Sequence, residues 1–394
     1  MWILELLLIA YCIKIGVYCI LYIRSSTEDL NRNTKVSNPL PSVDIILPMY
    51  NEEKVVVRTV NNLLDITYKA CTIIIVDDGS TDNSLSIVCS HFSGHPRIKI
   101  VHQENSGKSI ALNKGVSASN SDIIVCIDAD TLVKPDVLDK ILPYFQDSTV
   151  AAVSGYVKVG NRTNLITCMQ YIEYVTIQNF ERLVFEPMNG ILVVPGALGA
   201  FRRSVVIAMG GFKTDTLAED CDITIRMLCN NYVIKNAPSA IAFTEAPDST
   251  RMFIKQRVRW TVGMVQGLLK HGKELLTHSN KALAYLVIPY TWIFRILLPL
   301  LAPLADYYFI GGILAGTYGM LSYYLLFILV DAMVPAFIMV KREERAGVLK
   351  WILLQRFLLR HLTLLVFIQI LMKYFRGNQK GWGKIPRTGN VELE

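Results

Sequence analysis

Residues 122–130 read DIIVCIDAD, an apolar run that ends in two carboxylates one residue apart. The apolar part, residues 122–127, is typical of a buried β-strand because branched aliphatic side chains fill it. Asp128 and Asp130 would then stand at the end of that strand. Two such carboxylates can hold a hard divalent cation, Mg²⁺ or Mn²⁺, that is shared with substrate phosphates. The Asp-x-Asp pattern is short and frequent by chance, so its meaning depends on the elements around it.

Strands and helices alternate on both sides of this stretch. Further strands are predicted at residues 43–47, 72–76 and 98–101, and helices at residues 52–64, 84–89, 108–117 and 135–145. This alternation predicts an α/β fold in which helices cover both faces of a mostly parallel sheet. Ligands of such a sheet bind at the carboxyl ends of its strands, so the chemistry is expected there.

Between residues 150 and 280 the alternation loosens. The pattern predicts strands at 150–155 and 240–244, helices at 165–183 and 222–229, and a long amphipathic helix at 252–270. The helix at 135–145 is expected to begin at Pro135, which suits the first turn of a helix.

The two ends of the chain are much more apolar than its middle. Hydrophobic residues make up 52% of the chain and the mean hydropathy is +0.35, both high for a wholly soluble protein. Residues 1–23 are long enough to cross a bilayer. The basic residues Arg24, Arg32 and Lys35 follow this run, which favours an uncleaved anchor whose far end lies in the cytosol.

Further spans are predicted in the C-terminal third, at residues 283–301, within 307–340 and at 352–372. Residues 341–350 and the tail after Lys373 are both basic, so both should prefer the cytosol. A single span between them cannot satisfy both preferences. The number of C-terminal spans therefore stays open at three or four.

Charge and cysteine usage narrow the class of protein. The net charge of +7 suggests contact with anionic lipid or an anionic donor, and no aromatic-interleaved basic tract points to nucleic acid. Eight cysteines are scattered without a Cys-x-x-Cys pair, which fits free thiols in a reducing compartment.

Polar clusters follow two of the predicted strands. The first runs from Pro48 to Glu53 and contains Tyr50 and Glu52, and the second contains Asp77 and Asp78. Carboxylates directly after a buried strand can accept hydrogen bonds from a nucleobase or a ribose, so Glu52, Asp77 and Asp78 are predicted to bind substrate, together with the nearby Tyr50. The alternative is ordinary turn chemistry, because Asp-Gly and Pro-x-Tyr-Asn are common in turns.

Lys108 follows Gly107 at the predicted start of a helix. A lysine and free backbone N–H groups at such a point can face a phosphate. The spacing is not that of a Walker motif, which argues against an ATPase. Taken alone, Lys108 could equally be an ordinary surface lysine.

The most informative polar residues of the later chain are Glu219-Asp220 and the run Gln256-Arg257-Val258-Arg259-Trp260. A hydroxyl that attacks a donor needs a general base, and Asp220 is the best candidate for one, with Glu219 beside it in the expected substrate site. The two arginines can clamp diphosphate oxygens by paired hydrogen bonds, and the tryptophan can stack on a pyranose. The alternative is a basic interfacial helix anchored by tryptophan.

Taken together, Pro-x-Tyr-Asn-Glu, Asp-Asp-Gly-Ser, Gly-Lys, Asp-x-Asp, Glu-Asp and Gln-Arg-x-Arg-Trp, followed by membrane spans, form a recognisable series. The series resembles the membrane-integrated processive family 2 glycosyltransferases, which include hyaluronan, chitin, cellulose and poly-N-acetylglucosamine synthases. The resemblance covers about residues 40–390. It implies a GT-A-like transferase domain joined to α-helical transmembrane segments.

The resemblance also implies roles for single residues. Asp77 or Asp78 would hold the uridine, Lys108 would lie near the nucleotide, and Asp128 near the diphosphate. Asp130 would ligate the metal, Mg²⁺ or Mn²⁺, and Asp220 would be the catalytic base. Gln256, Arg257, Arg259 and Trp260 would close over diphosphate and acceptor. Gly196 lies in the run 195–203, which matches the acceptor region of the family, and residues 381–384 look like its C-terminal tail.

The implied activity is inverting polymerisation of a UDP-sugar into a β-linked polysaccharide, with coupled membrane export as a further expectation. Ala218 and the run 244–247 lean towards the poly-N-acetylglucosamine and chitin branch, so UDP-N-acetylglucosamine is the expected donor. Two alternatives remain: transfer of one sugar to a lipid acceptor, and an inactive membrane scaffold. Expected partners are the UDP-sugar donor, a growing saccharide, membrane lipid and a small accessory membrane subunit, with no nucleic acid.

The expected organisation places the protein in the cell membrane with its transferase domain facing the cytosol. The predicted parts are an anchor (1–24), a linker (25–42), the transferase domain (43–248), an interfacial amphipathic helix (249–280), transmembrane helices (281–372) and a basic tail (373–394). If the product is exported, Arg295, Asp306 and the tyrosines 307 and 308 are expected to line its passage, because charged groups inside spans usually face a polar path.

Overall fold

The computed structural model describes residues 2–30, 41–342, 344, 346–375 and 387–393. Its centre is one eight-stranded mixed sheet with the strand order β3-β2-β1-β4-β7-β6-β8-β5. The strands are β1 (Val43–Met49), β2 (Cys71–Asp78), β3 (Ile98–Gln103), β4 (Ile123–Cys126), β5 (Thr131–Val133), β6 (Val150–Val159), β7 (Gly199–Arg202) and β8 (Val233–Thr244).

The first four strands in this order, β3-β2-β1-β4, are parallel to one another, as the sequence predicts. Val43 of β1 pairs with Cys71 of β2 on one side and with Ile123 of β4 on the other. The strands are rich in fully buried branched aliphatic side chains, which is typical of parallel strands covered on both faces. Strands β2 and β3 are added on one side of β1 and β4 is added on the other, so the strand order reverses between β1 and β4. Ligands of such sheets bind beyond the carboxyl ends of the strands at such a point.

Helices pack against this sheet. They are α2 (Val56–Leu64), α3 (Ser84–Phe92), α4 (Lys108–Ala118), α5 (Val137–Ile141), α8 (Arg203–Ala208) and α9 (Glu219–Cys229). The predicted helix at 135–145 is shorter than expected. Helix α5 ends at Ile141, and a 3₁₀ turn follows at Leu142–Gln146. Pro143 lies at the start of that turn, where it cannot donate the hydrogen bond that would continue the α-helix.

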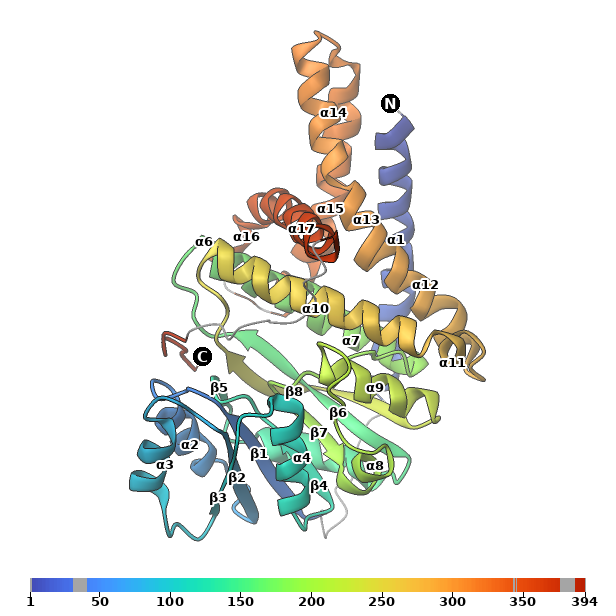
Figure 1. The fold of residues 1–394 in the computed structure, drawn as a ribbon. Helices are drawn as coiled ribbons and strands as arrows, with labels where there is room; N and C mark the ends of the chain where they lie inside the picture. The colour runs from blue at the N-terminus through green and yellow to red at the C-terminus, as the bar shows by residue number, and fades with distance from the viewer. Residues whose placement is uncertain (1, 31–40, 343, 345, 376–386, 394) are drawn as a thin grey trace.

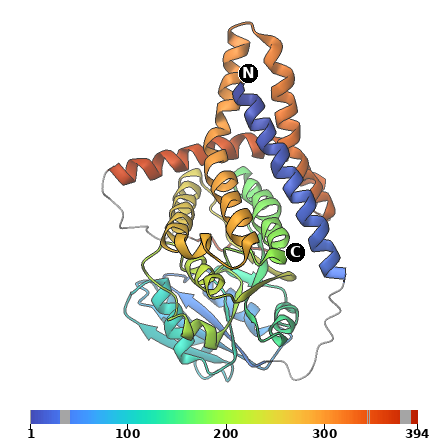
Figure 2. The ribbon, with the colours of Figure 1, turned by 90° about the vertical axis from the view of Figure 1, so that its right-hand side faces the viewer.

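Two long helical stretches lie side by side between the sheet and the apolar helices (Figures 1 and 2). One consists of α6 (Leu165–Glu173), a π-helical segment (Tyr174–Asn179) and α7 (Phe180–Phe185), with a short 3₁₀ turn after it at Glu186–Met188. The other is α10 (Thr250–Lys270), followed by α11 (Gly272–Leu276). The Ser249 side chain caps α10 by accepting a hydrogen bond from the Met252 N–H, 3.4 Å away.

Four helical segments of the described chain are long and apolar enough to cross a membrane: Glu5–Ile23, Leu283–Leu314, Leu321–Lys341 and Ile352–Phe375. The first belongs to α1 (Trp2–Leu30), and the last two are α15 and α17. The second is built from π-helical turns (Leu283–Val287 and Thr291–Leu297), α12 (Ile288–Tyr290), α13 (Leu298–Leu301) and α14 (Pro303–Leu314). The short α16 (Ala346–Leu349) lies between α15 and α17.

These apolar helices do not all run the same way. Helices α1, α14 and α15 run side by side away from the sheet, whereas α17 lies across them and against α10 (Figure 2). Phe253, Ile254 and Val258 of α10 bury a small apolar cluster with Val366 of α17. The fold is therefore a mostly parallel α/β domain joined to apolar helices, as expected from the sequence.

Candidate active site

The cation of Lys108 lies between carboxylates from two other elements. Its Nζ is 2.5 Å from Asp128 Oδ1, just after β4, and 3.4 Å from Glu219 Oε1 at the start of α9. Burial acts to lower the pKa of Lys108, but Asp128 and Glu219 raise it above its ordinary value. Gly196 makes room for this arrangement, because a Cβ there would lie 2.8 Å from the Lys108 Nζ. The predicted residues Lys108, Asp128, Gly196 and Glu219 thus form one cluster.

Asp130 also faces a cation, but one from the end of the chain. Its Oδ2 is 2.5 Å from Nη2 of Arg387, and its Oδ1 accepts hydrogen bonds from the hydroxyls of Thr131 (3.1 Å) and Thr244 (3.3 Å). Burial and the charge of Asp128 raise the pKa of Asp130, although Arg387 opposes this. Each of the two carboxylates of the Asp-x-Asp motif therefore forms an ion pair with a cationic side chain.

Asp220 lies in the first turn of α9, beside Glu219. Its Oδ1 accepts a hydrogen bond from the Cys221 N–H (2.8 Å) and its Oδ2 one from the Gly196 N–H (3.2 Å). Burial and the neighbouring Glu219 charge raise the pKa of Asp220 to about 6, although Lys108 opposes them. A carboxylate with this pKa is ionised at neutral pH and is still basic enough to take a proton, which suits a general base.

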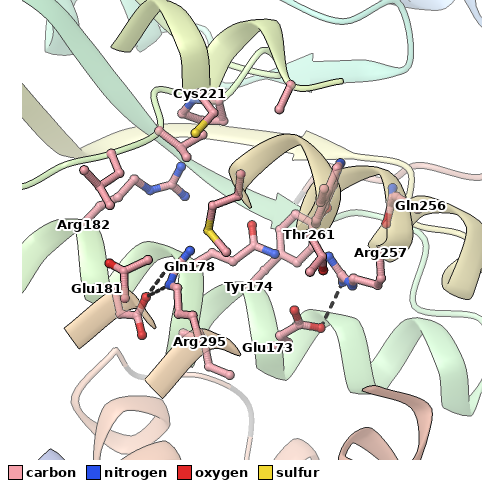
Figure 3. Close-up of a pocket in the computed structure, with 18 of the residues that line it drawn as sticks. Glu173, Tyr174, Gln178, Glu181, Arg182, Cys221, Gln256, Arg257, Thr261 and Arg295 are labelled. Carbon is pink, nitrogen blue, oxygen red and sulfur yellow. Dashed lines mark hydrogen bonds and ion pairs between the residues drawn. The ribbon is translucent and has the colours of Figure 1, made fainter. Parts of the chain in front are cut away.

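The run Gln256 to Trp260 places four side chains of α10 on one cavity. Arg257 donates from Nη2 to Glu173 Oε2 at 2.9 Å, and its Cζ lies 4.3 Å from the centre of the Trp260 ring. Its Nε and Nη1 have no hydrogen-bond partner among the described residues, and neither has Oε1 of Gln256. Figure 3 shows Glu173, Gln256 and Arg257 around the same space. Arg259 lies near enough to Asp128 to lower the pKa of that carboxyl, together with Lys108.

Asp77 and Asp78 lie inside the sheet rather than after it, because β2 runs on to Asp78. Asp77 is fully buried, and its Oδ2 is 2.7 Å from Nδ1 of His102. Asp78 accepts hydrogen bonds from the backbone N–H groups of Ser106 and Gly107, both at 2.9 Å. These bonds fix the turn that precedes Lys108. A nucleotide-binding role for either carboxylate stays a prediction.

Most of the predicted site residues line a single cavity of about 410 Å³. They are Lys108, Asp128, Gly196, Glu219, Asp220, Gln256, Arg257, Arg259 and Trp260. The cavity does not include Tyr50, Glu52, Asp77, Asp78 or Asp130. Tyr50 and Glu52 directly follow β1, and Glu52 is close enough to Arg387 to contribute, with Asp130, to the raised pKa of that guanidinium.

Sequence reasoning missed several residues of this site. Glu245 follows β8, lines the cavity and accepts hydrogen bonds from Thr388 N (2.6 Å), Thr388 Oγ1 (3.0 Å) and Gly389 N (3.0 Å). This carboxylate thereby fixes the segment that brings Arg387 to Asp130. The predicted tail motif at 381–384 lies outside the described residues. Only the carboxylate in the run 244–247 and a lone arginine near the C-terminus could have indicated this contact in the sequence.

Of the residues expected to line an export passage, one lines the cavity and the others do not. Arg295 lines the cavity and pairs with Glu181. Asp306 instead is buried between helices, where it accepts hydrogen bonds from the Tyr324 hydroxyl (2.7 Å) and from Arg360 Nη2 (3.1 Å). Tyrosines 307 and 308 have exposed side chains and do not line the cavity. The polar groups of the spans are therefore used partly to hold helices together.

Metal-binding capacity depends on the same two carboxylates. Within the described residues no group of three or more His, Cys, Asp or Glu side chains is arranged to hold a metal ion. Mg²⁺ and related ions are often bound by one or two carboxylates together with substrate phosphates, so the donors of Asp128 and Asp130 fit such an ion. The cations already drawn to both carboxylates show that this edge of the sheet attracts positive charge.

Comparison with known proteins agrees with this geometry. The family described as Glycosyl transferase family 2 matches residues 44–210, which run from β1 to the end of α8. Poly-beta-1,6-N-acetyl-D-glucosamine synthase of Staphylococcus aureus (strain COL) is 27% identical over 303 residues, which cover 74% of each chain. The enzyme of the same name from Staphylococcus epidermidis is 26% identical over 302 residues, covering 74% of this chain and 73% of the relative.

A solved structure shares the fold over nearly the whole chain. It is the mannosyltransferase PcManGT from Pyrobaculum calidifontis, in complex with GDP-Man and Mn²⁺, at a TM-score of 0.65 and 22% identity. The alignment covers 93% of this chain and 99% of that one. The chain is therefore a glycosyltransferase that transfers sugar from a nucleotide-sugar donor; its residues 44–210 match glycosyl transferase family 2, and most of its length is similar to poly-N-acetylglucosamine synthases.

Proposed function

We propose that this protein polymerises sugar from a UDP-sugar, UDP-N-acetylglucosamine in the first place, into a β-linked polysaccharide with inversion at the anomeric carbon. One observation carries the proposal. A single cavity joins Lys108, Asp128 and Asp220 to the Gln-Arg-x-Arg-Trp face of α10 and continues between the apolar helices. The similarity to poly-N-acetylglucosamine synthases supports the choice of donor.

The proposed reaction assigns the proton transfer to Asp220. The acceptor hydroxyl loses its proton to the Asp220 carboxylate while its oxygen attacks the anomeric carbon. The bond from that carbon to the diphosphate breaks, and the electron pair leaves with UDP. Lys108 and Arg259 would lie against the diphosphate and offset its growing negative charge. Arg257 and Trp260, which stack on each other, would form one wall of the acceptor site.

Asp128 and Asp130 are the residues that would hold a divalent cation, Mg²⁺ or Mn²⁺. When bound, such a cation supplies Lewis-acid neutralisation of the leaving diphosphate. The structurally similar mannosyltransferase carries Mn²⁺, which supports this part of the proposal. Lys108 and Arg387, the present partners of the two carboxylates, would then turn towards the diphosphate oxygens or away from the site.

The transferase domain is proposed to face the cytosol, because basic residues follow the first apolar helix. Donor would then enter from the cytosolic side, and product would leave through the continuation of the cavity between the apolar helices.

A donor panel tests this proposal. Purified protein in detergent is given radiolabelled UDP-N-acetylglucosamine, UDP-glucose, UDP-glucuronate or GDP-mannose, and the product is sized and its linkage determined. The proposal expects long chains from UDP-N-acetylglucosamine. A single-sugar lipid adduct would instead support transfer to a lipid acceptor alone, and the absence of any sugar transfer would support an inactive scaffold.

A further inference from the structure

The cavity has a second charged region, which begins near Asp220, whose charge acts on Arg182, and extends away from the Asp-x-Asp motif. There it reaches the apolar helices, and its walls include Lys14 of α1, Arg182 of α7 and Arg295 of the π-helical turn Thr291–Leu297. Figure 3 shows Glu181, Arg182 and Arg295 around this end, with Arg182 pointing into the space. None of these residues takes part in the proposed transfer chemistry.

Arg182 is a buried arginine that has no carboxylate partner among the residues the structure describes. Its side chain is 8% exposed, and its Nη2 donates to Asn179 Oδ1 at 2.7 Å. Its Nε has no hydrogen-bond partner within the described part of the chain. The adjacent carboxylate, Glu181, pairs with Arg295 instead. Burial and the charge of Arg295 lower the pKa of Arg182 to about 10, so the guanidinium stays charged at neutral pH.

Lys14 adds a second cation near the Glu181–Arg295 pair. Its Nζ lies 5.5 Å from the centre of the Tyr18 ring, and the Tyr18 hydroxyl donates to Glu181 Oε1 at 2.7 Å. Tyr290 completes this group by donating to the Tyr18 hydroxyl at 2.6 Å. Across the described ranges neither Lys14 nor Arg182 forms an ion pair, whereas Arg356, which lines the same cavity, pairs with Asp331.

The charges at this end therefore do not balance. The Glu181–Arg295 pair is neutral, which leaves the two cations Lys14 and Arg182 in largely apolar surroundings. A buried charge is costly unless it is paired and hydrogen-bonded, and charged side chains among membrane helices usually mark a functional site. A doubly negative ligand would supply the missing charge and would accept hydrogen bonds from the free donors of Arg182.

We propose that this end of the cavity binds the phosphate group of a lipid phosphate, on which the enzyme places its first sugar. The proposal rests on the proposed function, because it names the acceptor that starts the chain. Apolar side chains of the second candidate span, Phe294, Leu298 and Ala302, continue the wall of the cavity beyond the cations and would contact the lipid tail. An acidic polysaccharide fits less well, because it carries charges at intervals, whereas the two unbalanced cations lie at one end.

The first sugar transfer, to the lipid phosphate, does not require a general base. A phosphate oxygen of the lipid attacks the anomeric carbon of the donor, and the bond from that carbon to the diphosphate breaks. UDP leaves with the electron pair, and the lipid phosphate becomes a phosphodiester of the sugar. At neutral pH a phosphate monoester is already largely ionised, so no proton has to be removed from the attacking oxygen.

Binding without donor tests the site separately from catalysis. Farnesyl phosphate and farnesol, which share one apolar tail, are titrated into the full-length protein in detergent and the heat of binding is measured. We expect farnesyl phosphate to bind at least tenfold more tightly than farnesol. Equal binding of the two lipids would overturn the proposal. Sugar transfer is scored in a separate assay by release of UDP, so the proposed function can fail while the lipid site stands, and the reverse.

Single substitutions test whether Arg182 and Lys14 bind the phosphate group of farnesyl phosphate. Arg182→Gln is expected to weaken farnesyl phosphate about tenfold and to leave farnesol unchanged, and Lys14→Met is expected to act in the same direction. Arg251→Gln removes an exposed arginine at the start of α10 and should change neither. If Arg182→Gln fails to fold, as judged by lost UDP binding, Lys14→Met decides.

Unchanged farnesyl phosphate binding in the folded variants would show that the site is elsewhere. The proposal would also be overturned if a glucuronate oligosaccharide bound through Arg182 and farnesyl phosphate did not bind. The cations would then belong to a site for an acidic saccharide.

Discussion

Asp220 combines two properties that are difficult to obtain together, a basic carboxylate and a fixed orientation. Backbone N–H groups of Gly196 and Cys221 hold its two oxygens, while the adjacent Glu219 and burial keep its proton affinity high. Asp220→Asn keeps the shape and one accepting oxygen but cannot take a proton. We expect turnover to fall by about 10² to 10⁴ while UDP binding is retained.

Turnover and UDP binding are measured on the same preparation. The matched control is Asp136→Asn, which changes a half-exposed aspartate outside the cavity and should leave both unchanged. Near-normal turnover of Asp220→Asn would remove this residue from the mechanism.

The raised pKa of Asp220 also predicts a pH dependence. The base works only when ionised, and its pKa is raised to about 6 by burial and by Glu219. As the pH falls below about 6 the carboxylate is protonated, so kcat/KM should decrease about tenfold for each further pH unit. Above about pH 7 this group should cause no further change. A profile of kcat/KM that stays level down to pH 5 would contradict the assignment.

Removal of divalent metal tests the Asp-x-Asp motif. Asp128 and Asp130 are expected to hold a cation together with the donor diphosphate, so excess chelator should abolish transfer and added Mg²⁺ or Mn²⁺ should restore it. Asp130→Ala should lose this restoration and should also bind Mn²⁺ more weakly in the presence of UDP. Full activity in excess chelator would show that Lys108, Arg259 and Arg387 neutralise the diphosphate without a metal.

At the scale of elements, the contact between α10 and the loop before α9 sets the cavity width. A Cβ on Gly263 would lie 2.5 Å from the Ala218 Cβ and 2.7 Å from its backbone nitrogen, so the two backbones must separate if a side chain is added. Gly263→Ala is expected to destabilise the protein by about 1–3 kcal/mol through overpacking, and to lower activity because α10 carries Arg257 and Trp260.

Thermal unfolding in detergent measures this effect, and Gly272→Ala is its control. A Cβ on Gly272 would meet nothing within 4 Å, so that variant should unfold at nearly the temperature of the wild type. Equal unfolding temperatures for the two variants would mean that α10 and α9 adapt to the extra methyl group.

Elements with a strong local pattern were predictable from sequence, and contacts between distant segments were not. The parallel strands and α10 were placed nearly correctly, because apolar runs and helical periodicity are local properties. Strand β2 was predicted too short, since the buried carboxylates Asp77 and Asp78 look like turn residues and only their partners in β3 and the following loop explain their burial. The site roles of Glu245 and Arg182 could not be predicted from the sequence, because they depend on a C-terminal segment and on membrane helices that only the fold brings near.

At the scale of the whole molecule, the orientation of α17 suggests an answer to the conflict in the charge pattern. Basic residues precede α17 at Lys341 and Lys350 and end it at Lys373, so both ends should prefer the same side of the membrane. Helix α17 lies across α1, α14 and α15 rather than beside them (Figure 2). We propose three crossings, two of them in the C-terminal third and so fewer there than the sequence pattern suggests, with α17 in the interface on the side of the transferase domain.

Cysteine labelling checks this topology. In a background whose eight native cysteines are replaced by alanine, single cysteines are placed at His91, Tyr318, Gly347 and Tyr374, all of which are exposed. We expect a membrane-impermeant maleimide to label position 318 on intact cells and positions 91, 347 and 374 only after permeabilisation. The decisive comparison is between 347 and 374, which flank α17. If position 374 is labelled on intact cells while 347 is protected, α17 crosses the membrane. In that case the cavity would end between four spans rather than above an interfacial helix.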